Sequence, residues 1–187
     1  MTKWQRLTVL SADFDGQPTY LDCAGYTAIS VADMFEAIAG RRALPPHPVI
    51  LTFDDGYTNH YTQVFPMLHG YVGSFAIVTG FVEGGGPYVT WAQVREMSDA
   101  GMEMLAHTVS HADLGASNDV TVVDQLTRSR QPLAEATGRD IDFLVDPSGE
   151  PFRSGSVERQ QQVVEDAFHG VRVCPEAAKS SSCRRRA

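Results

Sequence analysis

The chain has 187 residues, of which 43% are hydrophobic and 20% charged, and its formal net charge at pH 7 is -8. This length and composition are typical of one globular domain and exclude an intrinsically disordered chain. The acidic balance argues against binding to nucleic acid or to an anionic membrane surface, and no stretch approaches the roughly 20 apolar residues of a membrane span. The three cysteines, Cys23, Cys174 and Cys183, are scattered and predict neither a disulfide framework nor a cysteine metal site.

Short apolar runs alternate with amphipathic segments along the chain. Residues 11–25 have helix-like apolar spacing, which Gly16 and Pro18 weaken by about 1 and 3 kcal/mol. Ser30 and Gly40 bound the first clear helix. The alternation predicts an α/β fold, a parallel sheet or barrel with helices outside it. Strands are expected at residues 26–29, 49–53, 73–79, 103–106, 141–145 and 171–174, and helices at residues 31–39, 57–69, 90–101, 119–137 and 157–168.

The run at residues 49–53, expected to be a strand buried on both faces, ends in Asp54-Asp55-Gly56. Two adjacent carboxylates at the carboxyl end of a buried strand repel each other unless they share a cation or a proton. Ligand sites in α/β folds gather at that end of the strands. The alternative is a D-D-G turn, in which Gly56 supplies a positive φ and both aspartates stay solvated. This stretch alone leaves both interpretations open.

A second motif, A-H-T-V-S-H, follows the expected strand at residues 103–106 and places His107 and His111 four residues apart. On one side of a helical turn, such a pair can bring two imidazole nitrogens to one cation. Considered alone, this spacing is more often ordinary surface histidine than a ligand pair. Because both motifs leave carboxyl ends of predicted strands, they should face the same rim. Two histidines and one carboxylate then form a three-ligand metal set, and the second carboxylate can act as a base.

Together the two motifs resemble the polysaccharide deacetylase family, the chitin and peptidoglycan deacetylase-like carbohydrate esterases. L-T-F-D-D-G-Y resembles the first motif of the family and H-T-V-S-H the second, and the similarity covers roughly residues 7–173. The resemblance implies a distorted (β/α) barrel with a divalent metal held by Asp55, His107 and His111. The metal is usually zinc, with Co²⁺ or Ni²⁺ as alternatives. Asp54 would be the base that takes a proton from the attacking water.

The later motifs depart from the family pattern. The third reads V-D-P-S-G-E, with Ser148 where the family has an aromatic residue, although the Ser148 backbone N–H could still stabilise an oxyanion. Tyr57 and Pro147 are the expected substrate contacts. Asp146 either adds negative charge near the base or belongs to a D-P-S-G turn. No counterpart is found for the fourth motif's tryptophan or the fifth motif's histidine, so the general acid is unassigned. Because both motifs come late in the family sequence, an incomplete barrel is an alternative to the complete one.

Two hypotheses of function follow from this resemblance. The first is metal-dependent hydrolysis of acetyl groups from N-acetylated or O-acetylated polysaccharides by a catalytic domain spanning residues 1–175, with residues 176–187 as a tail that is disordered or was added by cloning. The alternative is a catalytically impaired deacetylase-like domain that binds metal or glycan without turnover. The resemblance also implies a secreted or cell-envelope protein whose leader was removed, whereas the sequence as written shows no leader and leaves a cytoplasmic location open. The oligomeric state is not encoded in any recognisable pattern.

Overall fold

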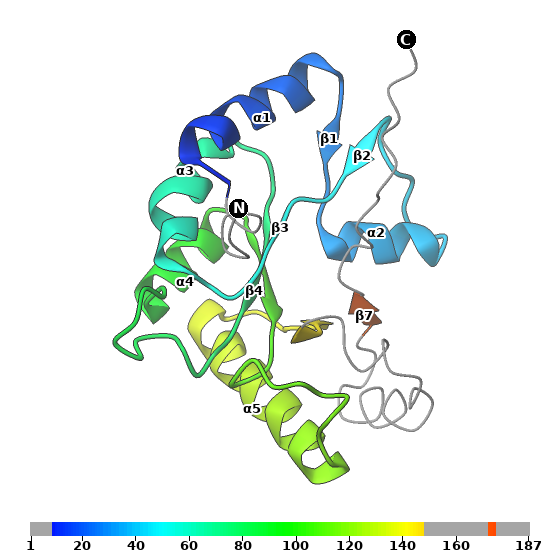
Figure 1. The fold of residues 1–187 in the computed structure, drawn as a ribbon. Helices are drawn as coiled ribbons and strands as arrows, with labels where there is room; N and C mark the ends of the chain where they lie inside the picture. The colour runs from blue at the N-terminus through cyan, green and yellow to red at the C-terminus, as the bar shows by residue number, and fades with distance from the viewer. Residues whose placement is uncertain (1–8, 148–171, 175–187) are drawn as a thin grey trace. The chain divides into compact units, whose positions relative to one another are not determined.

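Helices alternate with parallel strands in the computed structural model, which describes residues 9–147 and 172–174 (Figure 1). The strands are β1 (Thr27–Ala28), β2 (Pro48–Val49), β3 (Thr52–Phe53), β4 (Ser74–Ile77), β5 (Glu103–Ala106), β6 (Phe143–Val145) and β7 (Arg172–Cys174). The helices are α1 (Ser11–Cys23), α2 (Val31–Ile38), the π-helix η2 (His60–Val64), α3 (Phe65–Met67), α4 (Trp91–Asp99) and α5 (Asp119–Thr137). A two-stranded sheet has the order β1-β2, and a five-stranded sheet has the order β3-β4-β5-β6-β7. The pairings β1–β2, β3–β4, β5–β6 and β6–β7 are parallel, as the alternation predicts.

The chain divides into two compact units, Met1–Phe75 with Phe81–Met104 and Ala76–Gly80 with Leu105–Ala187. The first unit contains α1 to α4 and β1 to β3, and the second contains α5, β6 and β7. Strands β4 and β5 contribute residues to both units. The helix expected at residues 157–168 lies outside the described residues, whereas the strand expected at 171–174 is present as β7. Within the described part of the chain, every helix is too short or too polar to cross a membrane.

Within the first unit, the carboxylate of Glu103 ties the start of α2 to β4. Ser30 forms the expected cap of this helix as part of a capping box. The Glu103 carboxylate accepts hydrogen bonds from the backbone N–H groups of Val31 at 2.8 Å and Ala32 at 2.9 Å. It also accepts a hydrogen bond from the hydroxyl of Ser74 at 2.5 Å. Glu103 therefore satisfies two N–H groups that the first turn of a helix leaves without intrahelical partners, and it links them to β4.

The expectation of one strand at residues 49–53, buried on both faces, is wrong. The segment contains two separate short strands, because β2 pairs with β1 whereas β3 pairs with β4. Thr52 is exposed and Phe53 is partly exposed. The reason for the incomplete burial is that β3 is the edge strand of the five-stranded sheet, with one neighbour in the strand order.

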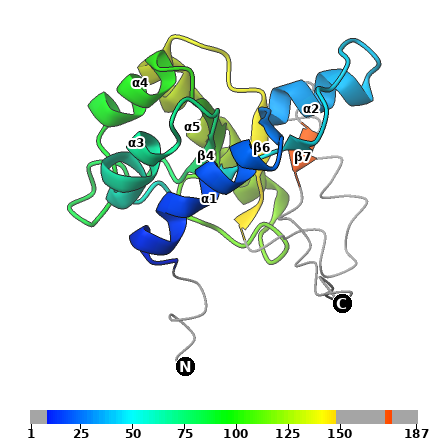
Figure 2. The ribbon, with the colours of Figure 1, turned by 90° about the horizontal axis from the view of Figure 1, so that it is seen from above.

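Helix α1 forms even though it contains Gly16 and Pro18. Tertiary contacts compensate for the low helix propensity: the Phe14 ring meets the Phe53 ring edge-on with centroids 5.9 Å apart, and Pro18 is buried. Both views place α1 next to α3 (Figure 1 and Figure 2), and the Ser11 hydroxyl donates a hydrogen bond to Gln63 in η2. Tertiary packing therefore stabilises α1, although the helix propensity of its own sequence is low.

The core and the long helix follow the predicted pattern closely. All four residues of β4 are buried. Helix α5 spans the predicted range, begins at the N-cap Asn118 and ends at Gly138, whose φ of 65° is the left-handed conformation that favours glycine. Apolar side chains at helical spacing on α5 are 0% exposed: Val122, Leu126 and Leu133.

Candidate metal centre

Asp54 and Asp55 directly follow β3, as expected. Asp55 has a φ of 77° and Gly56 a φ of 74°, so two successive residues adopt the left-handed conformation. Aspartate tolerates this conformation better than most residues other than glycine. The Oδ1 atom of each carboxylate is buried. This burial contradicts the alternative of a turn whose aspartates are fully solvated.

Tyr57, an expected substrate contact, belongs to an aromatic cluster in the first unit. Its ring stacks on Tyr88 with centroids 5.1 Å apart and an interplanar angle of 18°, and Tyr88 in turn meets Phe81 at 4.7 Å. The Thr58 hydroxyl donates a hydrogen bond of 2.8 Å to the Tyr88 carbonyl. Burial raises the pKa of Tyr57, and the negative charge of Asp55 raises it further. No sequence signal pointed to Tyr88 or Phe81.

His60, in the π-helix after the aspartates, is a partly buried imidazole with its Nδ1 atom buried and three aromatic rings nearby. Its ring centroid lies 5.9 Å from those of Phe53 and Tyr57 and 6.2 Å from that of Phe75. Burial lowers the pKa of His60 from 6.5 to about 4, against the opposing effect of the Asp55 charge. The side chain is therefore neutral at pH 7 and has no imidazolium proton to give. This makes His60 unsuited to the unassigned role of general acid.

His107, in the second unit, is oriented by a backbone carbonyl. It follows β5 directly, is 2% exposed, and its Nδ1 atom lies 2.7 Å from the carbonyl oxygen of Val145 in β6. Because a carbonyl only accepts hydrogen bonds, Nδ1 carries the hydrogen, which leaves Nε2 as the nitrogen that can bind a metal. A histidine that ligates a metal through one nitrogen commonly donates its other N–H in this way.

The segment between the two histidines is a turn without helical geometry, so the predicted helical placement of the pair is wrong. Thr108 and His111 have φ values of 63° and 55°. The side-chain amide oxygen of Gln125, on α5, accepts hydrogen bonds from the N–H groups of Val109 at 2.9 Å and Ser110 at 3.1 Å. The turn nevertheless brings the two imidazole rings to a centroid distance of 5.0 Å. No sequence signal pointed to Gln125, which holds this turn in place.

The predicted ligands come together. Asp55, His107 and His111 each offer one ligand atom, and these atoms all lie within 4.8 Å of one another. Ligand atoms 2.0–2.1 Å from one zinc ion in a tetrahedral site are about 3.4 Å apart, so small side-chain rotations suffice to bring the three onto one ion. One carboxylate oxygen and two imidazole nitrogens suit a divalent metal of borderline character. The three side chains can therefore hold a metal ion.

The third-motif residues are only partly described. Asp146 is 1% exposed, and Pro147 is also buried. Asp146 follows Val145, whose carbonyl orients His107, so a buried carboxylate stands one residue from that contact. The expected D-P-S-G turn extends beyond the described residues and stays a prediction. Ser148 lies outside the described residues, and its oxyanion role stays a prediction, as does the substrate contact of Pro147.

Comparisons with known proteins agree with this picture. Residues 41–167 match the family model described as polysaccharide deacetylase. A segment is 38% identical over 101 residues to the poly-beta-1,6-N-acetyl-D-glucosamine N-deacetylase of Escherichia coli, and the match covers 45% of this chain but only 15% of that protein. Two solved structures are similar: the Streptococcus pyogenes deacetylase PplD in complex with acetate, and the BpsB deacetylase domain from Bordetella bronchiseptica. PplD gives a TM-score of 0.78 at 22% identity over 91% of this chain and 76% of that one. BpsB gives a TM-score of 0.67 at 27% identity over 80% and 72%.

These matches confirm the expected α/β fold with parallel sheets, of the distorted (β/α) barrel type. The match to the family model extends over more than half of the chain and includes Asp55, His107 and His111. The chain belongs to the polysaccharide deacetylase family.

Proposed function

We propose that this protein hydrolyses acetyl groups from an acetylated glycan, with a divalent metal ion held by Asp55, His107 and His111. The observation that carries the proposal is the convergence of these ligand atoms within 4.8 Å, beside a second carboxylate on the adjacent residue. Zinc suits this donor set best, with Co²⁺ and Ni²⁺ as alternatives. The name of the Escherichia coli relative supports an N-acetylated amino sugar polymer as the substrate.

When bound, the metal ion would polarise the acetyl carbonyl and lower the pKa of a coordinated water. Asp54 is assigned as the base that accepts the proton of the attacking water. Its position next to the ligand Asp55 in the chain supports this role, because a base must lie within reach of the water that the metal would hold. His107 is fixed by the Val145 carbonyl and presents only Nε2 to the metal. The Ser148 backbone N–H is assigned as the oxyanion donor.

The aromatic cluster supports contact with a sugar ring. Tyr57 lies two residues after the ligand Asp55 and stacks on Tyr88. Aromatic faces pack against the C–H faces of sugar rings, while the phenol hydroxyl groups can bond to sugar hydroxyl groups. Tyr57 is therefore proposed as a substrate contact together with Tyr88, and this pair would compensate for the absence of an aromatic residue at Ser148.

A second candidate function is a deacetylase-like domain that binds metal or glycan without turnover. The observation that favours it is the buried Asp146, a carboxylate in the third-motif segment. An additional negative charge near the base would oppose the negative charge that develops on the carbonyl oxygen during attack.

Acetate release from N-acetylglucosamine oligomers and from acetylated xylan, with added zinc or with chelator, tests both candidates. We expect zinc-dependent release that Asp54→Asn lowers by about 10²–10⁴-fold with the metal retained. We expect Asp55→Ala to lose both metal and activity, and the exposed Asp99→Asn to change neither. Stoichiometric zinc binding without acetate release would establish the second candidate, whereas full activity in Asp55→Ala would refute the proposed site.

A further inference from the structure

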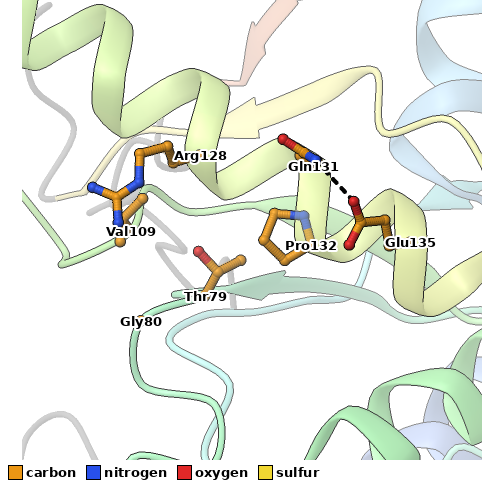
Figure 3. Close-up of a pocket in the computed structure, with 7 residues that line it drawn as sticks. All are labelled: Thr79, Gly80, Val109, Arg128, Gln131, Pro132 and Glu135. Atoms are coloured by element: carbon orange, nitrogen blue, oxygen red, sulfur yellow. Dashed lines mark hydrogen bonds between the residues drawn. The ribbon is translucent and has the colours of Figure 1, made fainter.

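A pocket of about 380 Å³ lies in the second unit between the end of β4 and α5, as Figure 3 shows. Thr79, Gly80 and Val109 line one side, and Arg128, Gln131 and Glu135 of α5 line the other. The volume falls in the range of small-molecule sites, about 300–1,000 Å³. None of the lining residues belongs to the proposed metal centre, although Val109 lies in the turn between its two histidines.

The side chain of Thr79 indicates that the pocket takes a polar ligand. Thr79 is 7% exposed, and its hydroxyl oxygen has no hydrogen-bond partner among the described residues. Its backbone N–H is satisfied by the carbonyl of Thr108 at 3.2 Å. Figure 3 shows this hydroxyl pointing toward α5. A buried hydroxyl without a partner is costly, and a ligand that supplies one recovers that cost.

Helix α5 offers the pocket both donors and acceptors. Pro132, which also lines the pocket, has no N–H, so the carbonyl of Arg128 loses its usual donor four residues along the helix. The Gln131 amide donates a hydrogen bond of 2.8 Å to Glu135, drawn as a dashed line in Figure 3, and keeps its carbonyl oxygen as an acceptor. The Arg128 guanidinium contacts Asp124 at 3.2 Å and has further N–H donors.

The charge and the apolar surface narrow the class of ligand. One arginine and one glutamate line the pocket, so their charges cancel and favour neither an anion nor a cation. The Pro132 ring and the Val109 side chain add apolar surface, against which C–H groups can pack. A neutral ring that carries several hydroxyl groups meets all of these conditions.

We propose that this pocket binds one neutral sugar residue, with the Thr79 hydroxyl and the polar side chains of α5 bonding to its hydroxyl groups. The choice of a glycan as the source of that residue rests on the proposed function, but binding in the pocket requires neither metal nor turnover. The pocket would then hold a residue of the polymer in addition to the one that is deacetylated.

The test is a titration of the isotope-labelled full chain with the N-acetylglucosamine trimer in the presence of chelator, followed by amide NMR shifts. We expect the signals of Gly80, Val109 and Gln131 to move. Thr79→Val keeps the shape of the side chain and removes the hydroxyl, so it should weaken binding about threefold to tenfold without lowering the melting temperature. Ser98→Ala is the matched control, because Ser98 is 1% exposed and its hydroxyl also lacks a partner among the described residues, but it lies in α4.

Equal affinity in wild type and Thr79→Val, or shifts that leave Gly80, Val109 and Gln131 unmoved, would overturn the proposal. The same titration in Asp55→Ala separates it from the proposed function. If the amide signals of Gly80, Val109 and Gln131 still move in Asp55→Ala while acetate release is lost, both proposals are supported. Pocket shifts in a wild-type protein that releases no acetate would refute the deacetylase proposal alone.

Discussion

Replacing Gln125 with leucine should weaken metal binding by about 10- to 100-fold while the protein stays folded. The Gln125 amide oxygen accepts the N–H groups of Val109 and Ser110, at 2.9 and 3.1 Å, and so holds the turn that carries both histidine ligands. Each bond contributes about 0.5–1.5 kcal/mol, or about 1–3 kcal/mol together. Thr108 and His111 adopt left-handed conformations, so a turn that is not held must be ordered when the metal binds. At about 1.4 kcal/mol per factor of ten, that cost corresponds to the expected loss of affinity.

The assay is competition for zinc with a chromogenic chelator, combined with thermal melts of the metal-free protein. Leucine is close to glutamine in size, so the variant should retain the packing of α5 against the turn. Gln131→Leu is the matched control, because Gln131 lies on the same helix and, among the residues that the structure describes, donates to Glu135 and not to the turn. Zinc affinity of Gln125→Leu within twofold of wild type would refute the argument, since Gln125 would then contribute to stability alone.

The remaining predictions concern stability, measured by urea denaturation of the metal-free protein. Glu103→Ala should cost about 2–4 kcal/mol, because three hydrogen bonds that tie α2 to β4 are lost, and an unchanged midpoint would contradict this. Burial lowers the pKa of His60 from 6.5 to about 4, so between these two pH values the unfolded chain binds a proton that the folded chain does not. The free energy of unfolding should therefore fall by up to about 3 kcal/mol as the pH drops from 6.5 to about 4. His60→Leu should flatten this part of the pH profile, and a profile identical to wild type would exclude His60 as its source. Gly80→Ala should lower the free energy of unfolding by about 1–3 kcal/mol, because a Cβ there would lie 2.4 Å from the Val109 carbonyl oxygen. In α1, a Cβ at Gly16 meets nothing within 4 Å, so Gly16→Ala should raise the free energy of unfolding by about 0.5–1 kcal/mol. Equal effects of the two substitutions would contradict this reasoning.

The sequence predicts those parts of the fold that depend on local chemistry. The capping residues Ser30 and Thr90 and the glycine at 138 mark helix ends that the structure has at the predicted positions. The placement of two histidines and two aspartates after the carboxyl ends of predicted strands also predicts that a carboxylate and both imidazoles meet, and the family resemblance selects Asp55 as that carboxylate.

What the sequence does not predict depends on contacts between distant segments. The Val145 carbonyl that orients His107 comes from a residue 38 positions away, and a backbone group carries no sequence signal at all. Gln125 is one polar residue among several on α5, and only the folded turn shows its role. Helix α1 and the split of residues 48–53 into two strands follow from packing and from the position of β3 at a sheet edge, which override local propensity.

The left-handed backbone at Asp55, Thr108 and His111 has a consequence for how such a site would decay over evolutionary time. In a lineage that no longer needs the metal, selection on the ligand atoms ends, but the turns must still form for the chain to fold. Replacements at these positions would then be limited by backbone conformation alone, which glycine and asparagine adopt most readily and valine and isoleucine rarely. Thr108 is β-branched and still adopts this conformation, with its hydroxyl accepting a hydrogen bond from the N–H of Ala112. Descendants that had lost the metal would therefore carry asparagine or glycine at these positions far more often than valine or isoleucine, and this bias would remain a readable trace of the vanished site.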